Sequence, residues 1–297
     1  MPRRFLFSFA LAALGLQSSE AWAGAYDLRL NQLGNVDGGG AATGNNDAFR
    51  SLASELGVLM APKPVDPADS LGLSGFAFSA DISLNTIKPD NWGNGVTRGT
   101  PNKMAPTLQV MGRKGLWPGI EIGAGATHLF NSRMWTISGY GKVALHEGFH
   151  HLPIPSIALR GMFSRLVGAE DMNMTTGSAD VSISHVFGLG KTVNLTPYIG
   201  YQALFIVARS GVLDVTPITD EYLNPTGKLS EFVFKDAGAI LRHRPFLGLR
   251  FIFSVIRITA EAMIVPGGNR NGKLNGMSVA DNSGLQQQYT LSLGLDF

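Results

Sequence analysis

Apolar and polar residues alternate in this chain from about residue 71 to the C-terminus, and this alternation restricts the possible folds more than any other property of the sequence. In its first stretch Phe76, Phe78 and Ala80 occupy every second position, and polar residues such as Ser79 and Asp81 lie between them. Successive side chains of a β-strand point to opposite faces of a sheet, so each stretch predicts a strand with one apolar and one polar face. The chain is therefore predicted to be all-β after residue 71.

Ten segments carry this pattern, and they are long for strands. Most span about 9 to 17 residues, whereas strands of globular proteins are typically about 5 to 6 residues long. A tilted strand that crosses a membrane needs about 9 to 11 residues. The pattern predicts a transmembrane antiparallel up-and-down β-barrel over residues 71–297, with apolar faces toward lipid. The predicted strands are 71–87, 106–116, 118–130, 133–147, 155–167, 173–187, 193–208, 246–254, 255–265 and 285–297.

The lengths of the connections test this strand count. A barrel with an even number of strands returns both ends to the periplasm and carries its longer loops outside. If the first strand runs outward, the three longest connections all fall on the outer side, namely 88–105, 209–245 and 266–284. A further hairpin around Phe232 to Phe234 would raise the count to twelve and preserve this agreement.

The N-terminus has the composition of a secretory signal peptide. Arg3 and Arg4 precede an apolar stretch that ends at Leu16, and small residues lead up to Ala23. This order of charged, apolar and small residues predicts export and cleavage after Ala23. Residues 1–23 are therefore assigned as the signal peptide and the protein is expected in the cell outer membrane. Removing two arginines and one glutamate changes the net charge from +2 to +1.

Residues 24–70 lack the alternation and are predicted to form a separate segment ahead of the barrel. The first part is rich in Gly and Asn, as flexible chain is. Asp47 is predicted to cap a short helix over 47–58, with Gly57 at its C-terminal end and apolar residues along one face. Three prolines then interrupt the chain between residues 62 and 67. We expect a periplasmic segment or a plug, with the helix inside or beneath the lumen.

Composition excludes several functional classes. The absence of cysteine excludes a disulfide framework, a thiolate metal site, a cysteine nucleophile and lipid attachment through an N-terminal cysteine. A net charge of +2 spread along the chain argues against binding of nucleic acid, which requires a concentrated basic face. With 44% apolar and only 15% charged residues, the chain is not largely disordered.

Eight charged residues fall on the polar faces of the predicted strands, four acids and four bases. A strongly ion-selective pore would show an excess of one sign. The balance favours structural pairing across a narrow interior, since barrels of eight to ten strands leave little free lumen. A path for small solutes is the alternative interpretation. The lumen-lining candidates are Asp81, Glu121, Lys142, Arg160, Asp180, Arg250, Arg257 and Glu261.

The histidines form no pattern that we assign to catalysis, a cofactor or a metal. Those at positions 146, 150 and 151 cross a strand end and a turn with glycine and prolines, which disrupts the helical spacing of a metal site. His185 follows Ser184, and adjacent strand residues point to opposite faces. His243 is placed on an external loop between two arginines, solvated or in contact with lipopolysaccharide.

The final segment supplies the sharpest motif, because the chain stops on an aromatic residue with apolar residues at every second position before it. This arrangement resembles the closing strand of Gram-negative outer-membrane β-barrels, the segment that their assembly machinery reads. The resemblance implies that the barrel-assembly machinery is a partner of this chain. The residues of the implied assembly signal are Tyr289, Leu291, Leu293, Leu295 and Phe297.

Other short stretches carry a second resemblance. Leu56-Gly57, Ala61-Pro62, the run from Leu71 to Phe76 and Lys114-Gly115-Leu116 resemble uncharacterised proteobacterial outer-membrane barrel proteins. That family has no known activity, so the resemblance implies fold and location and supplies no site residues. Outer-membrane lipids and lipopolysaccharide are the expected surroundings.

The sequence leaves three functional hypotheses. The first is a narrow or plugged channel for small solutes, and the second is a structural or surface-interaction barrel whose long loops bind something outside without transport. The third, ranked below them, is an outer-membrane hydrolase. We predict that the protein is not an enzyme and uses no cofactor.

Overall fold

The computed structural model describes residues 24–36, 41–97, 101–146, 154–189, 193–215, 231–235, 238–268, 272–274 and 277–297. The predicted signal peptide and the histidines at positions 150 and 151 lie outside these residues.

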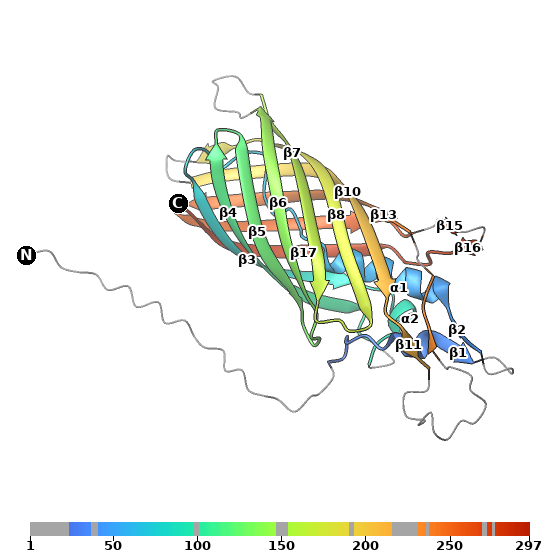
Figure 1. Cartoon of the computed structure of the whole chain (residues 1–297). Helices are drawn as coiled ribbons and strands as arrows, with labels where there is room; N and C mark the ends of the chain where they lie inside the picture. Colours follow the sequence, from blue (N-terminus) through green and yellow to red (C-terminus); the bar gives the residue numbers. More distant parts are fainter. Residues whose placement is uncertain are drawn as a thin grey trace, which may run out of the picture.

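Ten long antiparallel strands form one closed barrel, in which each strand pairs with the next along the chain and the last pairs with the first (Figure 1). A short strand, β9 (Phe187–Leu189), adds to the beginning of β10. The predicted fold class and the presence of all ten predicted strands are confirmed, but the first strand begins at Phe76 rather than at residue 71. The barrel strands are β3 (Phe76–Thr86), β4 (Met104–Trp117), β5 (Ile120–Leu129), β6 (Trp135–His146), β7 (Ser156–Val167), β8 (Met172–Ser184), β10 (Val193–Ser210), β13 (Ile240–Phe253), β14 (Ile256–Val265) and β17 (Gln286–Asp296).

The alternative of twelve barrel strands is wrong. The chain around Phe232 does form a hairpin, in which β12 (Glu231–Phe232) pairs with β11 (Leu213–Asp214), but these strands make a separate two-stranded sheet. The strand predicted to begin at residue 246 instead begins at Ile240, where it pairs with Ile206 of β10. The barrel therefore extends further at this side than the alternation indicated.

The two faces of the barrel wall have opposite polarity. On β3, Phe78 and Ile82 are 48% and 55% exposed, whereas Asp81 and Ser83 are fully buried. An apolar outside and a polar inside invert the arrangement of a soluble protein and match a barrel whose coat faces lipid. On the barrel strands, the outward apolar residues are therefore lipid-facing surface, whereas a separate buried apolar core surrounds helix α1.

The two ends of the barrel differ in their connections. At one end, Phe297 and Phe76 exchange backbone hydrogen bonds of 2.8 and 2.9 Å beside short turns such as that between β13 and β14. At the opposite end lie the described parts of the three longest connections, 87–103, 211–239 and 266–285 (Figure 1). Because long loops of such barrels face outward, we name these the periplasmic end and the outer end.

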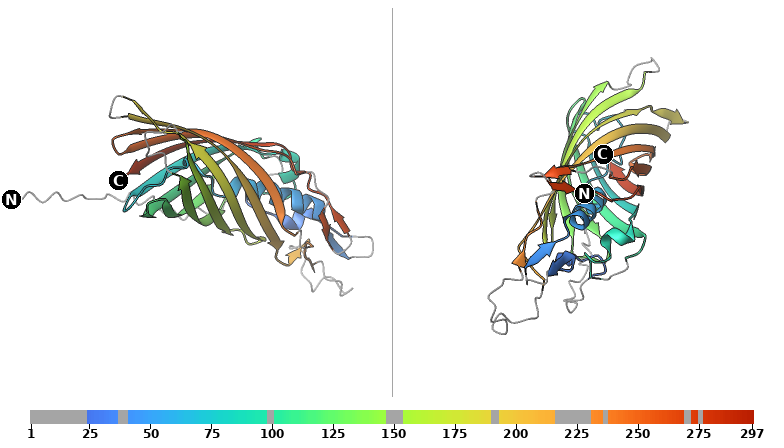
Figure 2. Two further views of the ribbon diagram at one scale, coloured as in Figure 1. Left: turned by 90° about the horizontal axis from the view of Figure 1, so that it is seen from above. Right: turned by 90° about the vertical axis from the view of Figure 1, so that its right-hand side faces the viewer.

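The described residues that precede the barrel begin at the outer end, with helix α1 (Asn46–Met60) within the barrel mouth (Figure 2). Backbone contacts join it to outer connections, as when the Tyr26 amide donates to the carbonyl of Asn131 at 3.1 Å and Leu28 bridges to Val96. The smaller elements at this end are η1 (Leu30–Leu33), β1 (Gly34–Val36), β2 (Ala42–Gly44), α2 (Pro89–Trp92), β15 (Gly272–Leu274) and β16 (Met277–Val279). In the described part of the chain, no helix is long and apolar enough to span a membrane.

Helix α1 differs from its prediction in three respects. Its N-cap is Asn45, whose side chain accepts from the Ala48 amide at 3.1 Å, rather than Asp47. Gly57 does not end the helix but lies against Ile206 of β10, where an added Cβ would come within 2.6 Å of the isoleucine side chain. The helix is also buried on every side from residue 49 to residue 60, because the barrel and its connections surround it.

Candidate functional site

The interior of the barrel is occupied by residues 61–70, which we call the luminal segment. It leaves α1 at the outer end and leads to β3, which begins at the periplasmic end (Figure 2). Lys63, Val65 and Asp66 are between 0% and 3% exposed. Three prolines, at positions 62, 64 and 67, give the segment no internal hydrogen-bonding pattern of a helix or strand. The lumen is thus filled by extended chain.

Side chains of the barrel wall satisfy the backbone of the luminal segment. The amide of Val65 donates to Glu261 at 2.9 Å, and the amide of Ala68 donates to Ser184 at 3.1 Å. Gln109 accepts from the amide of Lys63 at 3.0 Å and donates to the carbonyl of the same residue. Buried backbone groups need such partners, and the prolines reduce the number of donors that the wall must match.

The carboxylate of Asp66 is the electrostatic centre of the lumen. Arg113 of β4 places Nη1 2.8 Å from Oδ1, and Arg257 of β14 and Arg250 of β13 approach the same oxygen at 3.4 and 3.7 Å. The ammonium of Lys142 on β6 contacts the other carboxylate oxygen, Oδ2. Four cations from four strands thus surround one buried acid.

The other wall charges pair in two ways. Arg160 and Asp180 lie opposite one another on β7 and β8 with Nε and Oδ2 3.1 Å apart, and Lys142 also lies 3.3 Å from Glu121. Arg250 and Arg257 instead meet acids from outside the predicted set, among them Asp66. All eight lumen-lining candidates have buried side chains, from 0% to 5% exposed. Their partners include the luminal segment as well as one another.

Glu261 and Asp81 meet polar groups rather than bases. Glu261 accepts from the Tyr198 hydroxyl at 2.9 Å as well as from the amide of Val65. Asp81 accepts from Gln109 at 3.0 Å, and Gln109 in turn holds the luminal segment. These two acids therefore act on the segment through hydrogen bonds.

Sequence reasoning missed several buried charges. Asp66 and Lys63 lie in a proline-rich stretch without periodicity, so the sequence allowed a plug there without indicating that these two charges meet the wall. Arg113 could have been predicted, because continuing the alternation along the strand from Gln109 places it on the same, lumen-facing side. Arg242 and Arg244 point into the lumen from β13, at 2% and 0% exposure.

The prediction that His243 lies on an external loop is wrong. His243 lies within β13 opposite Ala203 and contacts Tyr201 on the outer face, while the arginines on either side of it point inward. Three successive polar residues occupy both faces of the strand there. The alternation that reveals a strand is therefore hidden at this position.

Helix α1 and the described parts of the three longest connections form one packed unit, which we call the outer cap. Glu55 of the helix accepts from the indole of Trp92 at 2.9 Å, from Asn91 at 2.7 Å and from the amide of Gly284 at 3.2 Å. The ring of Phe49 stacks on Phe234 with centroids 4.5 Å apart. The connections expected to reach outward thus close over the helix.

One residue of the luminal segment has a strained backbone. Val65 has a φ of 44°, a region that β-branched residues rarely adopt because of steric clash. Such a conformation costs on the order of 1–3 kcal/mol and persists where its surroundings enforce it. The hydrogen bond from its amide to Glu261 and its complete burial hold it in place.

His128 and His185 contact aromatic side chains on the outside of the barrel. His128 stacks on Trp135 with centroids 4.3 Å apart, and the His185 ring lies 4.7 Å from that of Phe187. Both aromatic partners are exposed on the outside of the barrel. Within the described ranges, no three histidine, aspartate or glutamate side chains gather as a set that could hold a metal ion.

The residues of the implied assembly signal alternate along β17 and end just beyond it. Each of them faces outward and is 43% to 67% exposed. Their recognition by assembly machinery stays a prediction.

No protein-family model matches this chain, and no curated protein matches it. Among solved structures, the translocator domain of autotransporter NalP from Neisseria meningitidis is 10% identical, with 85% of this chain and 98% of that chain covered and a TM-score of 0.38. The outer membrane protease OmpT from Escherichia coli is 10% identical, with 75% and 96% covered and a TM-score of 0.34. Ail of Yersinia pestis is 13% identical, with 76% and 99% covered and a TM-score of 0.27. At these identities and scores, none of their activities is transferred to this chain.

Proposed function

We propose that this protein is a channel of the outer membrane that its own N-terminal segment closes, and that small solutes cross when the segment shifts. The observation that carries the proposal is how the luminal segment is attached. Among the described residues, no backbone-to-backbone hydrogen bond joins residues 62–69 to a barrel strand, and the wall holds these residues through side chains. The segment can therefore shift without opening the hydrogen-bonded wall.

Two further properties support a movable closure. The luminal segment has no helix or strand of its own to unfold, so its displacement breaks contacts with the wall and the hydrogen bond from Lys63 Nζ to the carbonyl of Leu59 in α1. The strained backbone at Val65 adds a free-energy cost to the closed state that displacement would release. The wall that remains is polar on its inner face, as a path for water and solute requires.

The absence of native cysteine allows a direct test by an engineered disulfide. Ser54 of α1 and Ser283 of the connection after β14 have hydroxyl oxygens 3.3 Å apart, so cysteines at both positions are placed to form a disulfide. Oxidation would tie the helix that leads into the luminal segment to an outer connection. We expect single-channel openings of the double variant in planar bilayers to disappear on oxidation and to return on reduction.

A matched control comes from the wall itself. Ser83 and Thr290 are register partners on β3 and β17 with hydroxyl oxygens 2.8 Å apart. A disulfide between cysteines at these positions links strands that are already paired, so openings should persist after oxidation. Complete absence of conductance in the reduced protein would contradict the channel proposal.

The outer cap favours a second candidate, a barrel that presents a folded surface and transports nothing. Three connections that meet on one helix make an ordered structure rather than separate loops, and ordered surfaces suit recognition. The absence of conductance in every bilayer recording, for protein with an intact outer cap, would support this second function. We propose no catalytic role for either candidate.

A further inference from the structure

We infer that the four cations around Asp66 form an anion-binding site in the middle of the lumen. The Asp66 carboxylate occupies this site while the luminal segment is in place, and a small carboxylate solute occupies it once the segment is displaced. The identity of the solute rests on the proposed function, whereas the existence of the site does not.

The site is built from the barrel wall and not from the segment that fills it. Arg113, Lys142, Arg250 and Arg257 come from β4, β6, β13 and β14, and each is 0% to 5% exposed. Their nitrogen atoms converge on two carboxylate oxygens from different sides. Because hydrogen-bonded strands fix all four positions, the cations stay together when the segment leaves.

The charges on the wall do not balance at this level. Lys142 has Glu121 at 3.3 Å, and Arg257 has Asp296 at 3.4 Å. Within the described residues, Arg113 and Arg250 make ion pairs only with Asp66 and Asp69 of the luminal segment. Leaving buried cations without an anion is costly, so displacement of the segment creates a demand for a replacement anion.

The cations also offer more donors than Asp66 accepts. The Nε atoms of Arg113, Arg250 and Arg257 are buried and make no hydrogen bond to the described groups. The same is true of Nη2 of Arg257. Buried donors of this kind usually have partners. An anion with more acceptor atoms than one aspartate side chain, such as a hydroxycarboxylate or dicarboxylate, would satisfy them. A planar carboxylate suits the forked guanidinium donors.

The site is tested in the full mature chain by removing the Asp66 carboxylate and supplying a small carboxylate, formate, in solution. The D66A variant removes the side-chain carboxylate and leaves room for formate, whereas D66N removes the charge and keeps the volume filled. The measurement is the temperature at which heat-modifiable gel migration is lost, with sodium formate exchanged for sodium chloride at constant ionic strength. We expect formate to raise this midpoint by about 3 °C or more in D66A and to leave D66N and the unmodified protein unchanged.

Each outcome decides the inference. Equal shifts in D66A and D66N, or no shift in D66A, would overturn it. If D66A does not fold in chloride, the readout becomes refolding yield, which formate should restore. Failure of formate to restore it, while D66N refolds, would equally overturn the site.

A second measurement separates this inference from the proposed function. If the reduced S54C/S283C protein conducts, its reversal potential in a potassium chloride gradient should show preference for the anion. Substituting R113Q in that protein should reduce the preference. If the protein conducts without preferring anions, the channel proposal stands and the inference that the solute is a carboxylate is overturned. A protein that never conducts, with formate rescue of D66A intact, would overturn the channel and keep the site.

Discussion

The indole nitrogen of Trp92 donates a hydrogen bond to the Glu55 carboxylate at 2.9 Å, and both side chains are fully buried. The bond joins helix α1 to the connection between β3 and β4. The same carboxylate accepts from the amide of Lys88 at 3.0 Å and from the amide of Gly284. One acid therefore holds two outer connections on the helix.

Substituting E55A should open the outer cap. Each donor left buried without a partner costs about 1–3 kcal/mol, and several lose their acceptor together. In a background with W117F and W135F, Trp92 is the only tryptophan after the predicted signal peptide. We expect its fluorescence to shift to longer wavelength and acrylamide to quench it more strongly. E55Q, which keeps one acceptor oxygen, should show a smaller change, and an unshifted emission in E55A would contradict the role of Glu55.

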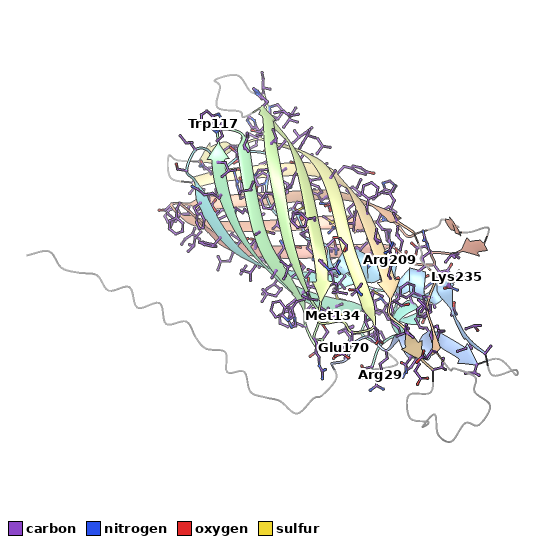
Figure 3. The ribbon with its side chains drawn as sticks, viewed as in Figure 1. Arg29, Trp117, Met134, Glu170, Arg209 and Lys235 are labelled. Carbon is purple, nitrogen blue, oxygen red and sulfur yellow. The ribbon has the colours of Figure 1, made fainter. Side chains whose placement is uncertain are left out.

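The N-terminus of the mature chain should be accessible from outside the cell. Asn35 is exposed and lies at the outer end, whereas Leu73 is 64% exposed and precedes β3 at the periplasmic end. Figure 3 shows the same separation between Arg29 and Trp117. Because the chain has no native cysteine, a single cysteine can be introduced at either position. A membrane-impermeant maleimide should label N35C on intact cells and label L73C only after permeabilisation. The reverse labelling pattern would show that the barrel has the opposite orientation in the membrane.

Adding one methyl group at Gly57 should weaken the docking of α1. The exchange of Gly for Ala favours a helix by about 1 kcal/mol, but the new Cβ meets Ile206, and overpacking costs about 1–3 kcal/mol. We expect a lower midpoint of thermal unfolding for G57A, and a smaller further loss when the same substitution is made in an I206A background. G161A serves as the control, because a Cβ there meets nothing within 4 Å.

The side chain of Phe297 should matter for assembly in the cell more than for folding in vitro. Its backbone pairs with Phe76, while its ring is 67% exposed on the outside of the barrel. F297A keeps the backbone pairing and removes the ring. We expect little heat-modifiable F297A protein in cells and nearly normal refolding from denaturant into detergent micelles. Normal levels in cells would contradict recognition of this residue, and a protein soluble without detergent would refute the barrel itself.

The strands were predictable because their signal is local and repeated. A lipid-facing coat forces an apolar residue at every second position, and β3 and β17 show this without interruption. The pattern failed where polar residues occupy both faces, as at Arg242 to Arg244 of β13. It also placed the eight predicted acids and bases on the inward face without indicating their partners.

The luminal segment could not be predicted in the same way. Extended chain rich in proline has no period, and a periplasmic tail and a buried plug have similar sequences. The position of Asp66 depends on four cations from strands spread between residues 104 and 265. Only closure of the barrel brings those strands around one point.

The barrel and the polarity of its two faces could be predicted from the sequence alone, since both depend on spacing within one strand and on the solvent that each face meets. The choice between ten and twelve strands needed the structure. The tertiary structure decided what fills the interior and what the long connections do. Those outcomes depend on contacts between residues far apart in the chain, such as Asp66 with Arg257 and Glu55 with Gly284. Ion pairs and hydrogen bonds across a lumen have no periodicity along the chain, so they appear only when the wall has closed.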